Sequence, residues 1–205
     1  MNIKPYIVGI CGGSASGKTY LLEQLLTQLP TEKVTLMSID NYYIALKDQE
    51  KDEVGMVNWD HPKSLNLEAF VDDVRKLMMG ESIMRKEFTF NHPPETAKTL
   101  YYSSTPILLL EGLFIFYKHE LNQLMDLKIF VEADEHIRLS RRLERDYYER
   151  GYTYDEVLES YNKYVAPMYE QYVEPTKKVC DMIIQNNQQM DHAAEVLVNH
   201  LKTVI

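Results

Sequence analysis

A glycine-rich segment near the amino terminus has the residue types and spacing of a phosphate-binding loop. Its residues Gly12, Gly13, Ser14, Ala15, Ser16, Gly17, Lys18 and Thr19 fit the Walker A pattern G-x-x-x-x-G-K-[ST]. The glycines allow successive backbone N–H groups to turn inward around an anion, and a following helix would direct its positive dipole end at bound phosphates. Lys18 would contact the β and γ phosphates, and Thr19 would bind Mg²⁺. We expect a nucleoside triphosphate here rather than a glycine turn without a ligand.

Three acidic residues follow predicted strands, at the sheet edge where ligands of open parallel sheets collect. Asp40 follows 34–39, Glu111 follows 107–110, and Glu132 follows 127–131. Glu111 has the Walker B position of a carboxylate that holds Mg²⁺, with glutamate in place of aspartate. Asp40 is placed to accept the proton of an acceptor hydroxyl. A helix cap or a solvated strand end is the alternative for each, and we favour it for Glu132.

Four arginines share one face of a predicted helix although the chain is net negative. Arg138, Arg141, Arg142 and Arg145 follow the spacing i, i+3, i+4, i+7, and Arg150 lies further on. Like charges on one face destabilise a helix unless an anion contacts them, and a triphosphate whose γ group is transferring is such an anion. The alternative is a solvated face paired with acidic residues of the same helix (Glu135, Glu144, Asp146 and Glu149). Beside a phosphate loop we favour a lid that contacts phosphates.

Alternating strand and helix signals predict an α/β fold, with a parallel sheet covered by helices on both faces. Strands are expected at 6–11, 34–39, 106–110, 127–132 and 181–185, and helices at 21–29, 65–79, 135–150, 154–173 and up to 201. A small β-hairpin is expected from 86–90 and 99–103. We predict one domain over 1–205, with an excursion at about 41–103 beside the acceptor and a helical lid region at about 138–155.

The composition disfavours several classes of protein. The 205 residues include 31 acidic and 22 basic ones, and the net charge of −9 argues against broad binding of nucleic acid or anionic membranes. Cys11 and Cys180 are too few for a disulfide framework and fit a reducing compartment. No apolar run approaches the roughly 20 residues of a membrane-spanning helix, and the amino terminus does not read as a signal peptide. We therefore expect a cytoplasmic protein with a small-molecule partner, no nucleic acid and no membrane.

Six blocks of the chain together resemble the uridine (uridine–cytidine) kinases of the phosphoribulokinase/uridine kinase group. They occur in the family's order: GGSASGKT at 12–19, SIDNYY at 38–43, NWDHP at 58–62, EGLFIFY at 111–117, RLSRRLERD with ERG at 138–151, and PTKK at 175–178. The resemblance implies a P-loop kinase fold. It also implies transfer of the γ-phosphate of ATP (or GTP) to the 5′-hydroxyl of a pyrimidine ribonucleoside in pyrimidine salvage. Because family members are often tetramers, a homo-oligomer is implied too.

The resemblance also implies catalytic and metal-binding roles. Asp40 would be the general base, and Lys18 and the lid residue Arg145 would contact the phosphates during transfer. Thr19, Asp40 and Glu111 would surround Mg²⁺.

The acceptor site implied by the resemblance matches the family only in part. Tyr43 would line the nucleoside pocket, and Asp60 and Arg142 would hold the ribose 2′- and 3′-hydroxyls. Four positions at or near the base differ from the family. Phe88 lacks the hydroxyl of the family's tyrosine, and His92 matches a base-reading histidine only if a gap is allowed. Tyr152 stands in place of an arginine, and Ser160 stands in place of a glutamine. Loss of a buried hydrogen-bonding partner changes polar specificity. Another nucleoside or a phosphosugar therefore stays open as the acceptor, and a nucleotide-dependent regulatory ATPase or switch is the alternative from a different class.

Overall fold

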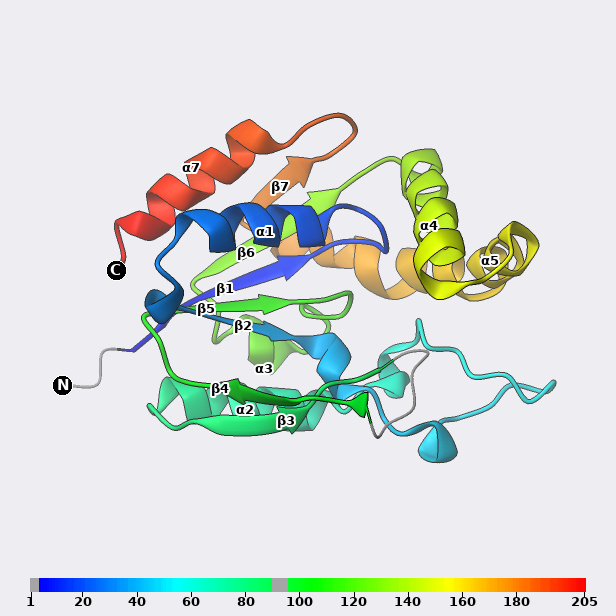
Figure 1. Cartoon of the computed structure of the whole chain (residues 1–205), viewed down its shortest axis with the longest axis horizontal. Helices are drawn as coiled ribbons and strands as arrows, with labels where there is room; N and C mark the ends of the chain where they lie inside the picture. The colour runs from blue at the N-terminus through cyan, green and yellow to red at the C-terminus, as the bar shows by residue number, and fades with distance from the viewer. Residues whose placement is uncertain (1–3, 90–95) are drawn as a thin grey trace.

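A five-stranded parallel sheet forms the centre of the computed structural model, which describes residues 4–89 and 96–205 (Figure 1). The strand order is β2-β5-β1-β6-β7. The strands are β1 (Tyr6–Cys11), β2 (Val34–Ser38), β5 (Ile107–Glu111), β6 (Leu127–Glu132) and β7 (Met182–Gln185). The predicted α/β fold class and each predicted strand of this sheet are confirmed. β2 ends one residue earlier than expected, because Ile39 begins a 3₁₀ turn.

Helices cover both faces of the sheet, because successive strand residues point to opposite faces. Val8 and Ile10 of β1 pack with the helices of one face, whereas Ile7 and Cys11 pack with those of the other. Figure 1 shows α1 and α7 above the sheet and α2 and α3 below it. These helices are α1 (Lys18–Gln28), α7 (Asp191–Lys202), α2 (Leu67–Met78) and α3 (His119–Asn122).

The helices of the predicted lid lie at the carboxyl end of the sheet, beyond the arrowheads of the strands (Figure 1). A capping box at Thr153 starts the second lid helix, since its hydroxyl accepts from the N–H of Glu156 and the Glu156 carboxylate accepts from the N–H of Thr153. The helical course predicted for 154–173 is confirmed, with two π-helical segments inside it. The elements are α4 (Glu135–Arg150), α5 (Tyr154–Ser160), π segments Tyr161–Val165 and Tyr169–Val173, and α6 (Ala166–Met168).

The small hairpin is present, but its first strand was predicted in the wrong place. β3 (Ile83–Lys86) pairs antiparallel with β4 (Thr99–Tyr102), and Ile83 lies opposite Tyr102. These two side chains are buried in the cluster that includes α2, and this burial fixes the pairing. Residues 86–90 alternate as a strand does, yet Phe88 leaves the ladder and lines a cavity instead. Phe90 and His92 lie outside the described residues.

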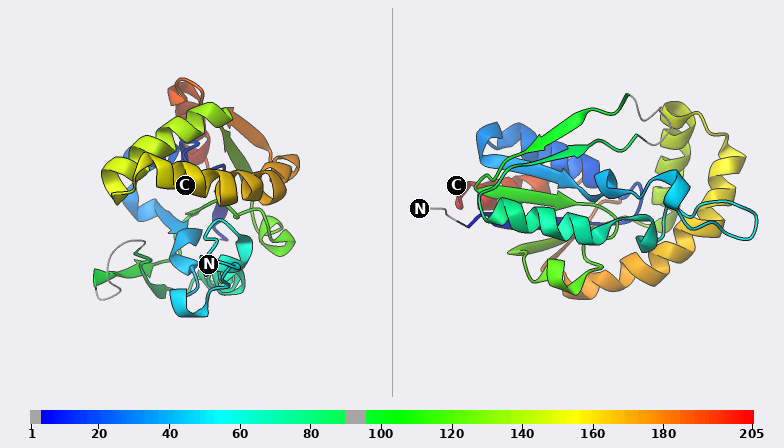
Figure 2. Two further views of the ribbon diagram at one scale, coloured as in Figure 1. Left: turned by 90° about the vertical axis from the view of Figure 1, so that its right-hand side faces the viewer. Right: turned by 90° about the horizontal axis from the view of Figure 1, so that it is seen from below.

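The chain after β2 makes a 3₁₀ turn, Ile39–Tyr42, that is anchored to α2 and the hairpin. The buried Asp73 carboxylate of α2 accepts hydrogen bonds from the Tyr42 hydroxyl at 3.0 Å and from Arg85 Nε at 2.6 Å. The loop from 43 to 60 (cyan) then extends at the same end of the molecule as α4 and α5 (Figure 2). Within the described ranges, no helix has the length and apolar character to cross a membrane.

Candidate active site

The phosphate-loop segment connects β1 to α1 at the carboxyl end of the sheet. Gly17 has a φ of 105°, and a Cβ atom there would lie 2.0 Å from Nδ2 of Asn186, so both conformation and space require glycine. Nδ2 of Asn186 donates to the carbonyl of Ser16 at 2.7 Å. The residue that follows β7 therefore fixes the shape of the loop from behind.

The Lys18 ammonium lies over the loop, where it donates to the carbonyls of Gly12 at 2.9 Å and Gly13 at 3.2 Å. The Ser16 hydroxyl is buried and has no hydrogen-bonding partner among the described residues. Gly12, Gly13 and Ser16 form the back of the loop and do not line the neighbouring cavity. Among the residues that the structure describes, Lys18 forms no ion pair, so its ammonium can turn to an anion without breaking one.

One cavity of about 1120 Å³ brings most of the predicted site residues together. Those that line it are Ser14, Ala15, Gly17, Lys18, Thr19, Asp40, Tyr43, Asp60, Phe88, Glu111, Arg142, Arg145, Tyr152 and Ser160. The cavity thus runs from the phosphate loop, past two strand-end carboxylates, to the loop after β2. Its volume lies above the range of about 300–1,000 Å³ that is typical of small-molecule sites.

Asp40 and Glu111 are neighbours because β2 and β5 pair in parallel. Ser38 lies opposite Glu111 in the register, and the N–H of Asp40 donates to the Ser38 hydroxyl at 3.2 Å. Burial, with the negative charge of Glu111, raises the pKa of Asp40 to about 7, although the Lys18 ammonium opposes the shift. A carboxylate whose pKa lies near neutrality suits the uptake of a proton from a hydroxyl group.

The donor set around Asp40 fits a magnesium ion. Thr19, Asp40 and Glu111 bring one hydroxyl and two carboxylates to the same cavity. Such hard oxygen ligands suit Mg²⁺, and the repulsion that raises the Asp40 pKa would be relieved by a cation between the carboxylates. Within residues 4–89 and 96–205, no group of three or more His, Cys, Asp or Glu side chains could hold a metal by itself. Mg²⁺ usually binds one or two carboxylates and completes its shell with phosphates and water.

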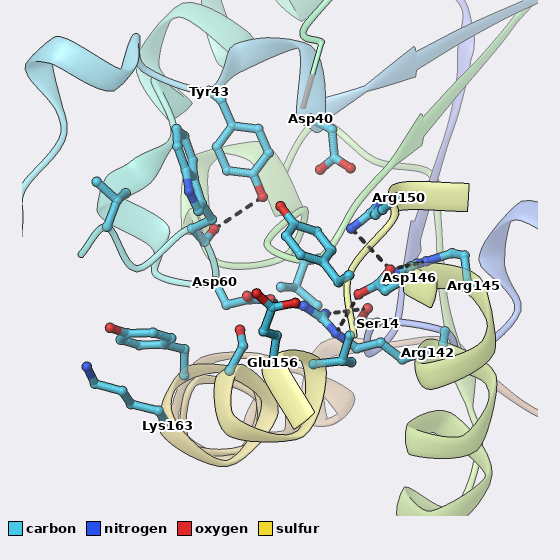
Figure 3. Close-up of a pocket in the computed structure, with 18 of the residues that line it drawn as sticks. Ser14, Asp40, Tyr43, Asp60, Arg142, Arg145, Asp146, Arg150, Glu156 and Lys163 are labelled. Atoms are coloured by element: carbon cyan, nitrogen blue, oxygen red, sulfur yellow. Dashed lines mark hydrogen bonds and ion pairs between the residues drawn. The ribbon is translucent and has the colours of Figure 1, made fainter. Parts of the chain in front are cut away.

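A buried carboxylate on α4, Asp146, holds three of the lid arginines (Figure 3). It accepts a hydrogen bond from Arg145 Nε at 2.9 Å and forms ion pairs with Arg142 Nε at 3.3 Å and Arg150 Nη1 at 3.4 Å. Only 3% of its side chain is exposed. The sequence interpretation treated Asp146 as one partner on a solvated face and missed this role. Its spacing of four residues from both Arg142 and Arg150 was the available signal.

Arg142 links the lid to two other parts of the cavity. Its Nη1 donates to the Ser14 hydroxyl at 2.9 Å and lies 3.9 Å from Oδ1 of Asp60. Burial raises the pKa of Asp60, and the positive charges of Arg142, Arg145 and Arg150 oppose that shift. The structure thus brings together the two side chains that the resemblance assigns to the ribose hydroxyls, and that assignment stays a prediction.

Two charged residues named in the sequence analysis, Arg138 and Glu132, lie outside the main cavity. Arg138 does not line the main cavity with the other arginines: its guanidinium lies 3.9 Å from the centre of the Tyr169 ring, and Nε donates to the carbonyl of Ala133. A Cβ atom on Gly13 would approach Arg138 Nη1 to 2.7 Å, so this arginine supports the loop from outside. Glu132 lies outside the main cavity and forms an ion pair with Lys177, whereas we favoured a helix cap or a solvated strand end for it.

Three aromatic rings line the cavity end far from the phosphate loop. The ring centre of Tyr43 lies 4.8 Å from that of Phe88 and 5.5 Å from that of Trp59. The Tyr43 hydroxyl donates to the carbonyl of Trp59 at 3.2 Å, and the N–H of Phe88 donates to Asn41 Oδ1 at 3.0 Å. These contacts fix an aromatic wall in which the Tyr43 ring is inclined by 80° to Trp59 and by 40° to Phe88, so a planar ring can pack against it by face or by edge.

Comparisons with known proteins agree with this geometry. Residues 7–193 match the Phosphoribulokinase / Uridine kinase family. The chain is 33% identical over 208 residues to a uridine kinase of Lactobacillus johnsonii, with 98% of this chain and 96% of the relative covered. The chain is also 32% identical over 200 residues to uridine kinase-like protein 5 of Arabidopsis thaliana. That match covers 98% of this chain but only 43% of the longer relative.

Among solved structures, a D-glycerate 3-kinase of Cryptococcus neoformans superimposes with a TM-score of 0.62 at 15% identity. The match covers 89% of this chain and 86% of that one. At this level of identity the likeness concerns the fold alone.

Proposed function

This chain belongs to the phosphoribulokinase/uridine kinase family, and we propose that it transfers the γ-phosphate of ATP to the 5′-hydroxyl of uridine or cytidine. The family makes it a phosphotransferase with a hydroxyl acceptor and a nucleotide as phosphate donor. One observation supports the finer proposal above all: the phosphate loop, the Asp40 carboxylate and the aromatic surface at Tyr43 line one continuous cavity.

In the proposed reaction the loop holds the donor. Backbone N–H groups of the loop and the amino end of α1 bind the phosphates, and Lys18 exchanges its carbonyl contacts for phosphate oxygens. Arg145, held by Asp146, stabilises the negative charge on the transferring group. Thr19, Asp40 and Glu111 would hold Mg²⁺, which when bound neutralises charge on the β and γ phosphates.

The acceptor hydroxyl loses its proton to Asp40. Burial raises the pKa of Asp40 and so favours its uptake of the hydroxyl proton, while the Lys18 ammonium favours its ionised form before the step. Asp60 and Arg142 hold the two other ribose hydroxyls, as acceptor and donor of hydrogen bonds respectively. The rings of Tyr43, Trp59 and Phe88 contact the base.

A coupled assay of ADP release over a panel of nucleosides and sugars tests the proposal. We expect turnover with uridine or cytidine and a nucleoside 5′-monophosphate by mass spectrometry. Turnover only with another nucleoside or a phosphosugar would assign a different acceptor to the same site. Hydrolysis that is independent of any acceptor would favour the regulatory ATPase. Use of GTP in place of ATP, assembly into a homo-oligomer and a cytoplasmic location stay predictions from the sequence.

A further inference from the structure

The acceptor end of the cavity is bounded on one side by a small turn in the loop after β2. Asp52 organises this turn: Oδ1 accepts from the N–H groups of Val54 at 3.1 Å and Met56 at 2.8 Å, and its own N–H donates to the carbonyl of Met56. Gly55 supplies the positive φ of 85° that the turn requires. The turn therefore has a defined shape that depends on one oxygen of the Asp52 carboxylate.

The second oxygen of the same carboxylate reaches the lid. Oδ2 of Asp52 accepts from Lys163 Nζ at 2.8 Å and from the Tyr164 hydroxyl at 2.7 Å. Lys163 and Tyr164 belong to the π-helical segment Tyr161–Val165, which continues α5. The loop and the lid helices extend at the same end of the molecule (Figure 2), and Lys163 lies at the edge of the cavity in Figure 3.

The turn has little apolar burial to hold it in this position. Val54 and Met56 are 72% and 57% exposed although both line the cavity. Segments with few buried apolar contacts open locally at low cost in free energy. The contact of Asp52 with Lys163 and Tyr164 therefore holds the 51–57 turn in place as a wall of the cavity.

We propose that Asp52, Lys163 and Tyr164 form a latch that holds the 51–57 turn against the lid and thereby sets the affinity for the acceptor. Asp52 is a positioning residue in this inference, since it acts through the wall. The inference rests on the proposed phosphoryl transfer to a small acceptor. Because side chains of Asp52 and Lys163 are 27% and 44% exposed, the pair is weak enough to open and admit the acceptor.

Hydrogen–deuterium exchange in the ligand-free protein tests the latch itself. Lys163→Met and Tyr164→Phe remove its two donors without changing the turn. We expect faster exchange of the backbone amides in 51–57 in both variants. The matched control is Lys118→Met, which breaks a surface ion pair with Glu68 far from the cavity and should leave that exchange unchanged. Unchanged exchange in both latch variants would overturn the inference.

Steady-state kinetics with uridine tests the consequence. We expect the KM for uridine to rise about two- to fivefold in Lys163→Met, the range measured for exposed ion pairs, while the KM for ATP stays constant. Asp52→Asn should give a smaller rise than Asp52→Ala, because the amide oxygen still accepts hydrogen bonds. If the KM for uridine and the KM for ATP changed equally, the proposal that the latch sets the affinity for the acceptor would be wrong.

The two proposals can fail separately. If the wild type phosphorylates uridine and the latch variants keep its KM, the latch is wrong and the function stands. If the wild type phosphorylates none of the panel, the proposed function is wrong. The latch is then judged by the exchange of 51–57 and by uridine binding, measured through the fluorescence of Trp59, the single tryptophan of the chain.

Discussion

Arg142 of the lid helix donates a hydrogen bond from Nη1 to the hydroxyl of Ser14 in the phosphate loop, at 2.9 Å. The same nitrogen lies 3.9 Å from the Asp60 carboxylate on the acceptor side. One guanidinium thus links the phosphate loop to the part of the cavity where we propose that the acceptor binds. Asp146 fixes that guanidinium from behind, so the arrangement does not depend on a bound ligand.

Replacement of Asp40 by asparagine should abolish most of the turnover. The amide keeps the size of the side chain but cannot take the hydroxyl proton, so kcat should fall by about 10²-fold or more. Binding of nucleotide, measured by titration calorimetry, should change little. Asp48→Asn, at an exposed carboxylate of the neighbouring loop, is the matched control. Equal kcat in the Asp40 variant would remove this residue from the mechanism.

The same variant should alter the pH dependence of stability in the metal-free protein. Because the folded-state pKa of Asp40 is raised to about 7, the folded state binds a proton that the unfolded state releases near pH 4. The stability that the neutral Asp40 provides is present at low pH and is lost as pH rises from about 4 through 7. Asp40→Asn should therefore have a higher Tm than the wild type at pH 8, and the difference should shrink at pH 5. A Tm difference that is independent of pH would contradict the raised pKa.

Asp60→Ala should weaken binding of the acceptor more than binding of the phosphate donor. The variant removes a carboxylate that can accept from ribose hydroxyls and that faces Arg142. Loss of a hydrogen bond to a charged group corresponds to a rise of about tenfold or more in the acceptor KM. Initial rates with each substrate varied in turn measure the effect. A change confined to the KM for ATP would show that Asp60 has been assigned to the wrong substrate.

Asp146→Asn should lower both stability and donor affinity. The variant keeps an oxygen that accepts hydrogen bonds but leaves Arg142, Arg145 and Arg150 without their shared negative partner. We expect the free energy of unfolding to fall by about 1–3 kcal/mol in urea titrations, with a higher KM for ATP. Glu149→Gln, an exposed acid on the same helix, should leave both unchanged. An Asp146 variant as active and stable as that control would exclude the positioning role.

Much of the fold could be predicted because its signals are local. The apolar run of β1, the loop at 12–19 and the leucines of α1 are consecutive in the chain, so composition and periodicity identify strand, turn and helix. The hairpin shows the limit of such signals. Residues 86–90 alternate like a strand, but the pairing follows the burial of Ile83 and Tyr102 against α2, which no local pattern contains.

The sequence by itself determined that a phosphate loop, strand-end acids and an arginine-rich helix are present, since backbone preferences and spacing encode them. Only the tertiary structure decided which of these side chains meet. The Arg142–Ser14 bond joins residues 128 positions apart, and the Asp52–Lys163 bond joins residues 111 positions apart. Such contacts depend on strand register and on the burial of partners such as Asp146, and these are properties of the packed chain rather than of any segment.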